Sequence, residues 1–344
     1  MRSKTFLITF ILAACIFLLN VLTGWKEIPA DVKAADIEKS VSKSLRLLEK
    51  SGQVFINRSR PKCVSCHHNT LTSMVAEKAK LKGIPVTDSF TVARVETMNE
   101  VVKFFNINLP DQFISAKFIG PYLLLAMAAE KIPASPSTDI IVDYMAGQQI
   151  ADGSFQAESG RNPLETGEAH LTAMTIRAIQ LYASPSKKAL VDKLVSRSRH
   201  WLENIHPNEE QELAFQLLGM HWCGSSREMK QTVVDKLKSI QHADGGWSQL
   251  PTMSSDAYAT GQVLYALFES GMMKAEDEVY QNGISYLLKT QDESGAWIVE
   301  TRSYPIQPYF NSEFPPYNEN QYISATATNW ASLALLEALP DKTN

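Results

Sequence analysis

Apolar side chains recur at helical intervals along most of the chain after residue 35. This periodicity predicts about six helical hairpins, so the predicted fold class is all-α. Three of the hairpins contain similar segments that share one internal spacing. The three less regular hairpins are expected at 36–52 with 67–82, at 88–106 with 115–131, and at 187–204 with 208–222.

Each of the three similar segments places a glutamine six residues before an aromatic side chain, with a glycine two residues before the aromatic. The glutamine closes an amphipathic helical pattern, and the glycine supplies the turn that ends the helix. The three pairs are Gln149 with Phe155, Gln241 with Trp247, and Gln291 with Trp297.

A second, more apolar helix follows each turn and begins near Glu168, Asp256 and Ser324. In each of them a threonine precedes a small alanine by six residues, so the three helices share one register and can pack closely. Because a single hairpin cannot bury its own apolar face, we expect a closed array of stacked hairpins. The pairs are Thr172 with Ala178, Thr260 with Ala266, and Thr328 with Ala334.

The segments from glutamine to Gly-x-aromatic resemble the QW repeats of squalene and hopene cyclases and of the related protein prenyltransferases. The resemblance covers residues 36–340 and implies an (α/α)6 toroid, in which an outer ring of helices surrounds an inner ring. It also implies that the repeated glutamine and aromatic side chains tie neighbouring helices together.

The resemblance does not extend to the catalytic residues of those enzymes. A cyclase of this family has a cluster of aspartates ending in the acid that protonates an alkene, whereas Ser254–Tyr258 contains the single carboxylate Asp256. The Asp, Cys and His that bind zinc in prenyltransferases are not recognisable either, because no cysteine follows near Asp256. Terpene cyclisation is therefore not expected, and the sequence leaves open whether the protein is an enzyme.

The N-terminus has the pattern of an export signal. Arg2 and Lys4 precede an apolar run from Phe6 to Leu22, so residues 1–34 are expected to form a signal peptide or an N-terminal membrane anchor. Lipidation of Cys15 is an alternative, although an apolar segment follows this cysteine. We expect an exported protein, periplasmic or anchored to the membrane on that side. With 33 basic and 37 acidic residues, the net charge of −4 argues against nucleic-acid binding.

The clearest candidate for chemistry is Cys63-Val-Ser-Cys66-His67, which has the attachment pattern of covalent haem c. Both thiols can add to the haem vinyl groups, and the adjacent His67 imidazole can bind the iron as its proximal ligand. Two other interpretations stay open. The cysteines can form a disulfide or a redox-active pair, or they can bind zinc together with His67 or His68.

The helix after this motif fits the register of the later second helices, because Thr70 precedes Ala76 by six residues. In a toroid, aligned positions lie at one level around the mouth of the central cavity. We therefore expect other polar groups to converge on the motif. The distal iron position can be taken by His170, by Met74 or by no protein ligand. The alignment places His68 with His170, Tyr258 and Thr326, and Cys66 with Glu168, Asp256 and Ser324.

Three classes of function are compatible with the sequence. The first is an exported haem protein that exchanges electrons with a redox partner. The second is a protein that binds a small apolar or glycan-like ligand and uses the two cysteines as a disulfide. The third is a lyase or isomerase that uses Glu168, His170, Asp256 and Tyr258 as acid and base. The aromatic, proline-rich segment 300–320 can either fold over the same cavity mouth or pack on its rim.

Overall fold

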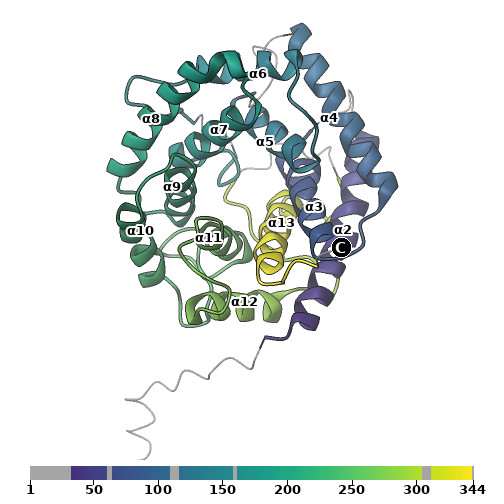
Figure 1. The fold of residues 1–344 in the computed structure, drawn as a ribbon. Coiled ribbons are helices and arrows are strands. Elements are labelled where there is room, and N and C mark those ends of the chain that lie inside the picture. Colours follow the sequence, from purple (N-terminus) through teal and green to yellow (C-terminus); the bar gives the residue numbers. More distant parts are fainter. Residues whose placement is uncertain (1–31, 60–63, 109–115, 158–160, 304–310, 343–344) are drawn as a thin grey trace, which may run out of the picture. The chain divides into compact units, whose positions relative to one another are not determined.

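Helices alternate along the chain between an outer and an inner ring (Figure 1). The computed structural model describes residues 32–342, except 60–63, 109–115, 158–160 and 304–310. Among the described residues there are twelve α-helices and no β-strand, so the predicted all-helical toroid is confirmed. Residues 1–31 of the expected signal or anchor segment lie outside the described residues. None of the described helices has the length and apolar character needed to span a membrane.

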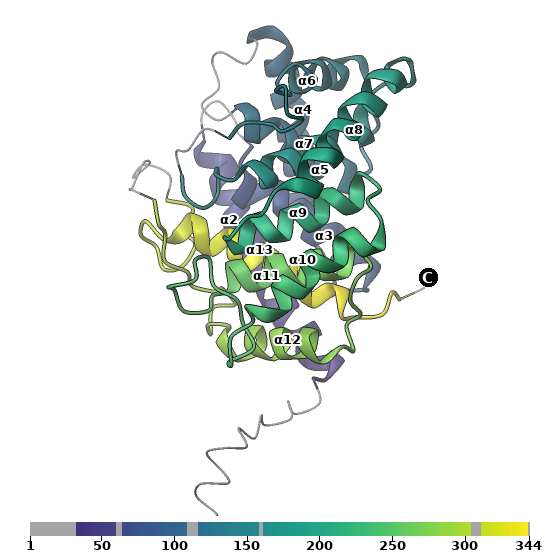
Figure 2. The same ribbon diagram turned by 90° about the vertical axis from the view of Figure 1, so that its left-hand side faces the viewer.

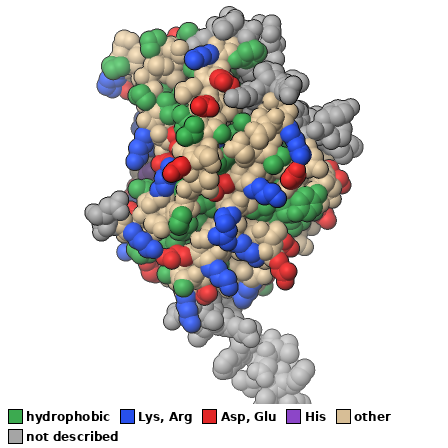
Figure 3. Space-filling model, turned by 90° about the vertical axis from the view of Figure 1, so that its right-hand side faces the viewer, with side chains coloured by type: hydrophobic (Ala, Val, Ile, Leu, Met, Phe, Trp, Pro, Cys, Tyr) green, Lys and Arg blue, Asp and Glu red, His purple; other side chains and the backbone are tan. Residues whose placement is uncertain are grey.

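The outer helices are amphipathic and bury one face. In α12, for example, Tyr280, Ile284 and Leu287 are buried at helical spacing while the other face meets solvent. Figure 3 views the side where α2 and α4 lie, and it shows acidic and basic side chains mixed with small hydrophobic areas. The outer ring consists of α2 (Ala34–Arg58), α4 (Asp88–Asn108), α6 (Pro136–Ala146), α8 (Lys188–Asn204), α10 (Arg227–Ser239) and α12 (Glu278–Thr290).

The inner helices contact one another in a closed circuit, because α13 packs against both α11 and α3 (Figures 1 and 2). Gly261 of α11 lies so close to α13 that a Cβ atom there would approach the Trp330 carbonyl carbon to 2.6 Å. The ring centre is filled by side chains, since Trp330 contacts Phe215 and Tyr265. The inner ring consists of α3 (Leu71–Leu81), α5 (Ala116–Ala129), α7 (Glu168–Tyr182), α9 (Glu210–Trp222), α11 (Ala257–Glu269) and α13 (Gln321–Glu337).

The repeated glutamines join neighbouring outer helices. Their Nε2 groups donate hydrogen bonds to main-chain carbonyls of the next outer helix: Gln149 to Leu194 at 3.0 Å, Gln241 to Val279 at 2.9 Å, and Gln291 to Ser40 at 3.1 Å. The last of these bonds closes the ring, because it connects α12 with α2 at the beginning of the described chain. Each glutamine lies beyond the end of its helix rather than within it, as the helix boundaries show.

The glycine of each segment has a backbone with positive φ and lies against the next outer helix. At Gly245, φ is 91°, and a Cβ atom would come within 2.4 Å of the Asn282 carbonyl oxygen. The aromatic residue of each segment is buried. Its main-chain N–H donates a hydrogen bond to the hydroxyl oxygen of the threonine in the paired inner helix. The three donors and acceptors are Phe155 with Thr172, Trp247 with Thr260, and Trp297 with Thr328.

Candidate functional site

The described part of the haem-type motif forms a tight turn that leads into α3. Cys63 and the side chain of Cys66 lie outside the described part of the structure. The Asn69 Oδ1 accepts a hydrogen bond from the Ser65 N–H at 2.7 Å, and the Thr70 hydroxyl donates to the Ser65 carbonyl at 3.0 Å. Residues Cys66–Thr70 form a π-helical turn, η1, so the motif lies where an inner helix begins.

His67 is buried at this helix start. Its ring centroid lies 4.9 Å from that of Tyr322 and 4.6 Å from that of His68. Its carbonyl accepts a hydrogen bond from the Asn329 side chain of α13 at 3.0 Å. Burial, with smaller contributions from His68 and Arg161, lowers the pKa of His67 well below its usual value. The imidazole is therefore neutral at pH 7, which is the form that binds a metal.

His68 is buried beside it in an aromatic surrounding. The centroid distances from His68 are 5.1 Å to Phe55, 5.8 Å to Tyr322 and 6.4 Å to Phe314. Burial lowers the pKa of His68 to about 3. Neither of its ring nitrogens has a hydrogen-bond partner among the described residues. We call His67, His68, Phe55, Phe314 and Tyr322 the histidine cluster.

The described end of the aromatic segment 300–320 lies over the histidine cluster. Phe314 is fully buried, and the residues just before it are hydrogen-bonded to α2. The Ser51 hydroxyl donates to the Ser312 carbonyl at 2.9 Å, and Arg58 donates to the Asn311 carbonyl at 2.5 Å. Residues 304–310 of this segment lie outside the described residues.

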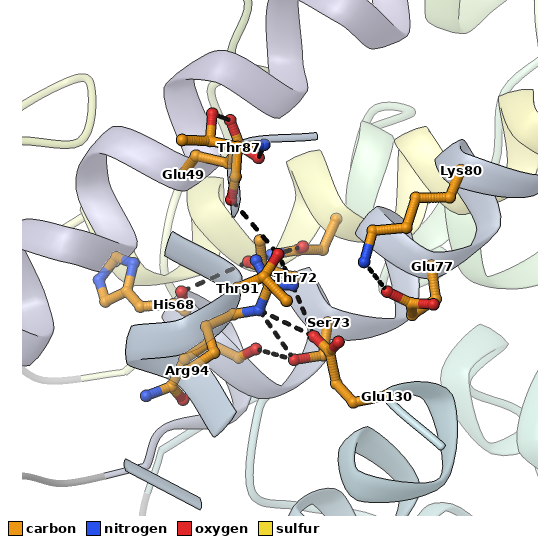
Figure 4. A network of polar contacts seen from close by, with 12 residues as sticks. Glu49, His68, Thr72, Ser73, Glu77, Lys80, Thr87, Thr91, Arg94 and Glu130 are labelled. Carbon is orange, nitrogen blue, oxygen red and sulfur yellow. Dashed lines mark hydrogen bonds and ion pairs between the residues drawn. The ribbon is translucent and has the colours of Figure 1, made fainter. Parts of the chain in front are cut away.

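A buried ion pair fixes α3 behind the motif (Figure 4). Arg94 of α4 is fully buried and lies 2.5 Å from a carboxylate oxygen of Glu130, which follows α5. Its Nε also donates to the Ser73 hydroxyl of α3 at 3.1 Å. One residue earlier, Thr72 donates to the Asn329 side chain of α13 at 3.1 Å. Three neighbouring helices therefore hold the helix that carries the motif.

The two candidates for a distal iron ligand lie elsewhere in the toroid. His170 has both ring nitrogens engaged, one 2.9 Å from the Tyr122 hydroxyl and the other 3.1 Å from the Thr166 carbonyl. Burial lowers the pKa of His170 to about 4. Met74 lines a cavity further along α3, toward the C-terminal ends of the inner helices.

The expected alignment of His68 with His170 does not bring these two side chains together. The aromatic neighbours of His170 come from α5 and α9, whereas those of His68 come from α2, from α13 and from the segment before α13. The physical reason is that α5 packs between α3 and α7 in the inner ring, and the start of α3 also differs locally through its π-helical turn. Thr70 donates to the Ser65 carbonyl, whereas Thr172 and its two equivalents accept from an aromatic N–H.

Two of the proposed acid and base residues are linked through a glutamine. The Tyr258 hydroxyl of α11 donates to the Gln211 side-chain oxygen of α9 at 2.5 Å. The Gln211 amide lies 3.4 Å from the His170 Nδ1 of α7 and donates to the Thr166 carbonyl at 2.9 Å. His170 and Tyr258 therefore belong to one buried network between α7, α9 and α11.

A pair of acidic residues lies next to this network. Asp256 caps α11 by accepting from the Ala259 N–H at 2.9 Å, and it also accepts from Gln249 at 3.0 Å. Glu210 of α9 is 2% exposed, and neither of its carboxyl oxygens has a hydrogen-bond partner among the described residues. Burial, together with the charge of Asp256, raises the pKa of Glu210 well above its usual value. Burial raises the pKa of Asp256 as well.

We call Asp256 and Glu210, with the adjacent Glu212, the acidic site. The sequence did not indicate its two α9 residues, Glu210 and Glu212. Glu168 is exposed, and the group that contacts the start of α7 is instead Glu212, which accepts from the Ala169 N–H at 2.9 Å. Glu210, Gln211 and Glu212 begin a helix without any repeated motif. A run of three polar residues at the start of an otherwise apolar inner helix was the available signal.

The two histidines of the histidine cluster have suitable chemistry for binding haem iron or zinc. Burial keeps both imidazoles neutral, and the ring nitrogens of His68 have no hydrogen-bond partner among the described residues. No group of three or more His, Cys, Asp or Glu side chains within the described ranges is arranged to hold a metal ion. The fourth cysteine, Cys223, is free and buried, and burial raises the pKa of its thiol to about 12.

Comparison with known proteins establishes the fold. No family model and no curated protein matches the sequence. Among solved structures, the type II terpene cyclase MstE from Scytonema is 14% identical, with a TM-score of 0.57 over 90% of this chain and 99% of that one. A possible GH105 family member from Salmonella enterica serovar Paratyphi A is 11% identical, with a TM-score of 0.52 over 90% and 95%. The chain therefore has the helical toroid fold of terpene cyclase-like proteins.

Proposed function

We propose that this protein is an exported haem c protein that exchanges electrons with a redox partner. Cys63 and Cys66 would hold the haem, because each thiol S–H can add across a vinyl double bond without a leaving group. His67 would bind the iron. The observation that carries the proposal is the Cys-Val-Ser-Cys-His motif at the start of α3, with a His67 imidazole that burial keeps neutral. Bound haem supplies one-electron chemistry at this end of the toroid.

The surroundings of the motif support the proposal. Phe55, Phe314 and Tyr322 provide an apolar, aromatic wall of the kind that favours a large flat ring system. The apolar N-terminal segment supports export, which haem c attachment requires. His170 is occupied by Tyr122 and Thr166, so we propose that it does not serve as the distal ligand.

The test is to export the protein from a host that has cytochrome c maturation. We expect a Soret band, and haem that stays on the chain after denaturation. Cys66→Ala and Cys63→Ala should each reduce or remove this covalent haem. Cys223→Ala is the matched control and should retain it, because Cys223 is buried on the α9 side of the toroid. A colourless protein with a Cys63–Cys66 disulfide, or one that contains zinc, would overturn the proposal.

A second candidate function is acid–base catalysis as a lyase or isomerase on an apolar or glycan-like ligand. The observation that favours it is the neutral Glu210 carboxyl beside Asp256, with His170 and Tyr258 in the adjacent network. Glu210 would donate a proton and Asp256 would accept one. Turnover of polyprenyl and unsaturated glycan probes should then be lost in Glu210→Gln and Asp256→Asn without loss of fold. The exposed Glu209→Gln is the control. Wild-type protein that converts neither class of probe would exclude this candidate.

A further inference from the structure

A cavity of about 450 Å³ lies along α3 and among the C-terminal halves of α5, α11 and α13. All inner helices run in the same direction, so this cavity is at the opposite end of the ring from the histidine cluster. Its volume is within the range of small-molecule sites, roughly 300–1,000 Å³. The functions proposed above do not use it.

The walls of the cavity are apolar. They are formed by Met74 of α3, Leu125 and Ala129 of α5, Tyr265 of α11 and Leu333 of α13. Four inner helices therefore each present one or two uncharged side chains to the same space. An apolar body can be buried there at a gain of roughly 25 cal/mol per Å² of surface removed from water.

The remaining lining residues are mostly cationic. Lys78, Lys80, Lys131 and Lys342 line the cavity, against the single acidic residue Glu77. The chain as a whole has a net charge of −4, whereas the residues that line this cavity have an excess of positive charge.

Ion pairs within the chain account for three of these lysines but not for the fourth. Lys78 pairs with Glu337, and Lys342 lies 3.1 Å from Glu38. Lys80 pairs with Glu77. Lys131 is exposed in the turn that ends α5, and its ammonium has no ion-pair or hydrogen-bond partner within the described residues. The attraction of cations to helix C-termini explains its position but leaves its charge available to an anion.

Unpartnered polar groups lie one turn deeper on two of the same helices. Gln262 precedes Tyr265 by three residues, and Trp330 precedes Leu333 by three, so each shares a helix face with a lining residue. Both are 1% exposed. The Gln262 amide atoms and the Trp330 Nε1 have no hydrogen-bond partner among the described residues. A buried polar group without a partner costs about 1–3 kcal/mol, which a ligand oxygen at this depth would offset.

We propose that this cavity binds an amphiphilic organic anion, with its apolar body between α3, α5, α11 and α13 and its anionic group at Lys131. Lys342 adds a second positive charge at this end, because its pair with Glu38 is solvent-exposed and therefore weak. The apolar walls select the body, and the lysines select the charge. The chemistry is that of a medium-chain carboxylate. The deeper polar groups favour a ligand that also carries an oxygen at its inner end.

The experiment measures binding of dodecanoate, 12-hydroxydodecanoate, dodecanol and dodecyltrimethylammonium by calorimetry to the full chain. The two carboxylates should bind, dodecanol should bind about tenfold more weakly, and the cation should not bind. The double variant Lys131→Gln/Lys342→Gln should weaken carboxylate binding about tenfold, whereas the control Lys188→Gln on outer helix α8 should not.

Two cavity-filling variants, Leu333→Trp and Ala129→Phe, test the location from different helices. Each should abolish binding while the circular dichroism and Tm stay close to wild type, and the second protects the test if the first fails to fold. Equal binding of all four probes, no binding of either carboxylate, or unchanged binding in a folded cavity-filling variant would overturn the proposal. Covalent haem is scored separately, so its loss does not affect this result.

Discussion

Glu210 is a carboxyl group whose ionisation is controlled by the packing of α9 against α11. It lies in the first turn of α9 with no partner for either oxygen among the described residues, and Asp256 is close enough to raise its pKa further. An isolated buried carboxylate is costly, so the group stays protonated instead. A single burial of this kind creates a proton donor in a part of the chain where the sequence shows no catalytic motif.

We predict that this residue makes stability depend on pH. The pKa of Glu210 is higher in the folded protein than its ordinary value of 4.5, so the unfolded chain releases the proton first. The free energy of unfolding should therefore fall as the pH rises above 4.5, until the folded pKa is reached, by at most about 1.4 kcal/mol per pH unit. Glu210→Gln, which is neutral at every pH, should flatten this decline in urea unfolding between pH 5 and 8. Glu209→Gln should leave it unchanged, and parallel curves for Glu210→Gln and wild type would contradict the prediction.

At the scale of elements, helices with a clear apolar period could be predicted closely. The expected ranges 88–106 and 187–204 correspond to α4 at Asp88–Asn108 and α8 at Lys188–Asn204. The start of α3 could not be predicted, because the bonds of Ser65 to Asn69 and Thr70 convert its first residues to a π-helical turn. A match of threonine to alanine spacing does not detect such a turn.

The ion pair behind the motif gives a prediction for one element. Arg94→Met leaves the Glu130 carboxylate buried without its cation, so the free energy of unfolding should fall by about 3–5 kcal/mol. Arg94→Met combined with Glu130→Met should recover much of this loss, since no charge is then buried. The exposed pair of Lys188 with Asp192 supplies the control, and Lys188→Met should change stability by less than about 1 kcal/mol. Equal losses in the single and double variants, measured by urea unfolding, would show that charge burial is not the cause.

At the scale of the whole molecule, the three glutamine and aromatic segments indicated a closed array, and the ring is closed. The acidic site and the far cavity could not be predicted, because each is assembled from helices distant in the sequence. Gln211 on α9, Tyr258 on α11 and His170 on α7 come together only when the ring forms. The apolar periodicity of a single helix carries no information about which of its residues contact residues of two other helices.

Ring closure through Gln291 can be measured. Gln291→Ala removes the bonds to Ser40 and Gly295, and we expect a loss of about 1–3 kcal/mol. Amide hydrogen exchange should become faster in α12 and α2, which are the last and the first of the described outer helices. Gln149→Ala, which removes the equivalent bond to Leu194, should instead affect α6 and α8. If both variants accelerated exchange in the same helices, the bonds would not act as local joints.

The contact of α13 with the histidine cluster has a consequence for the order of biosynthesis. Asn329 bonds both the His67 carbonyl and the Thr72 hydroxyl, and the Lys342 N–H bonds the Leu81 carbonyl, so residues that are synthesised long after the motif hold the helix that carries it. Until these residues have been synthesised, the turn before α3 lacks one of its walls. If haem is attached as proposed, a maturation enzyme would therefore meet the motif with this wall still absent in the interval before α13 docks against α3.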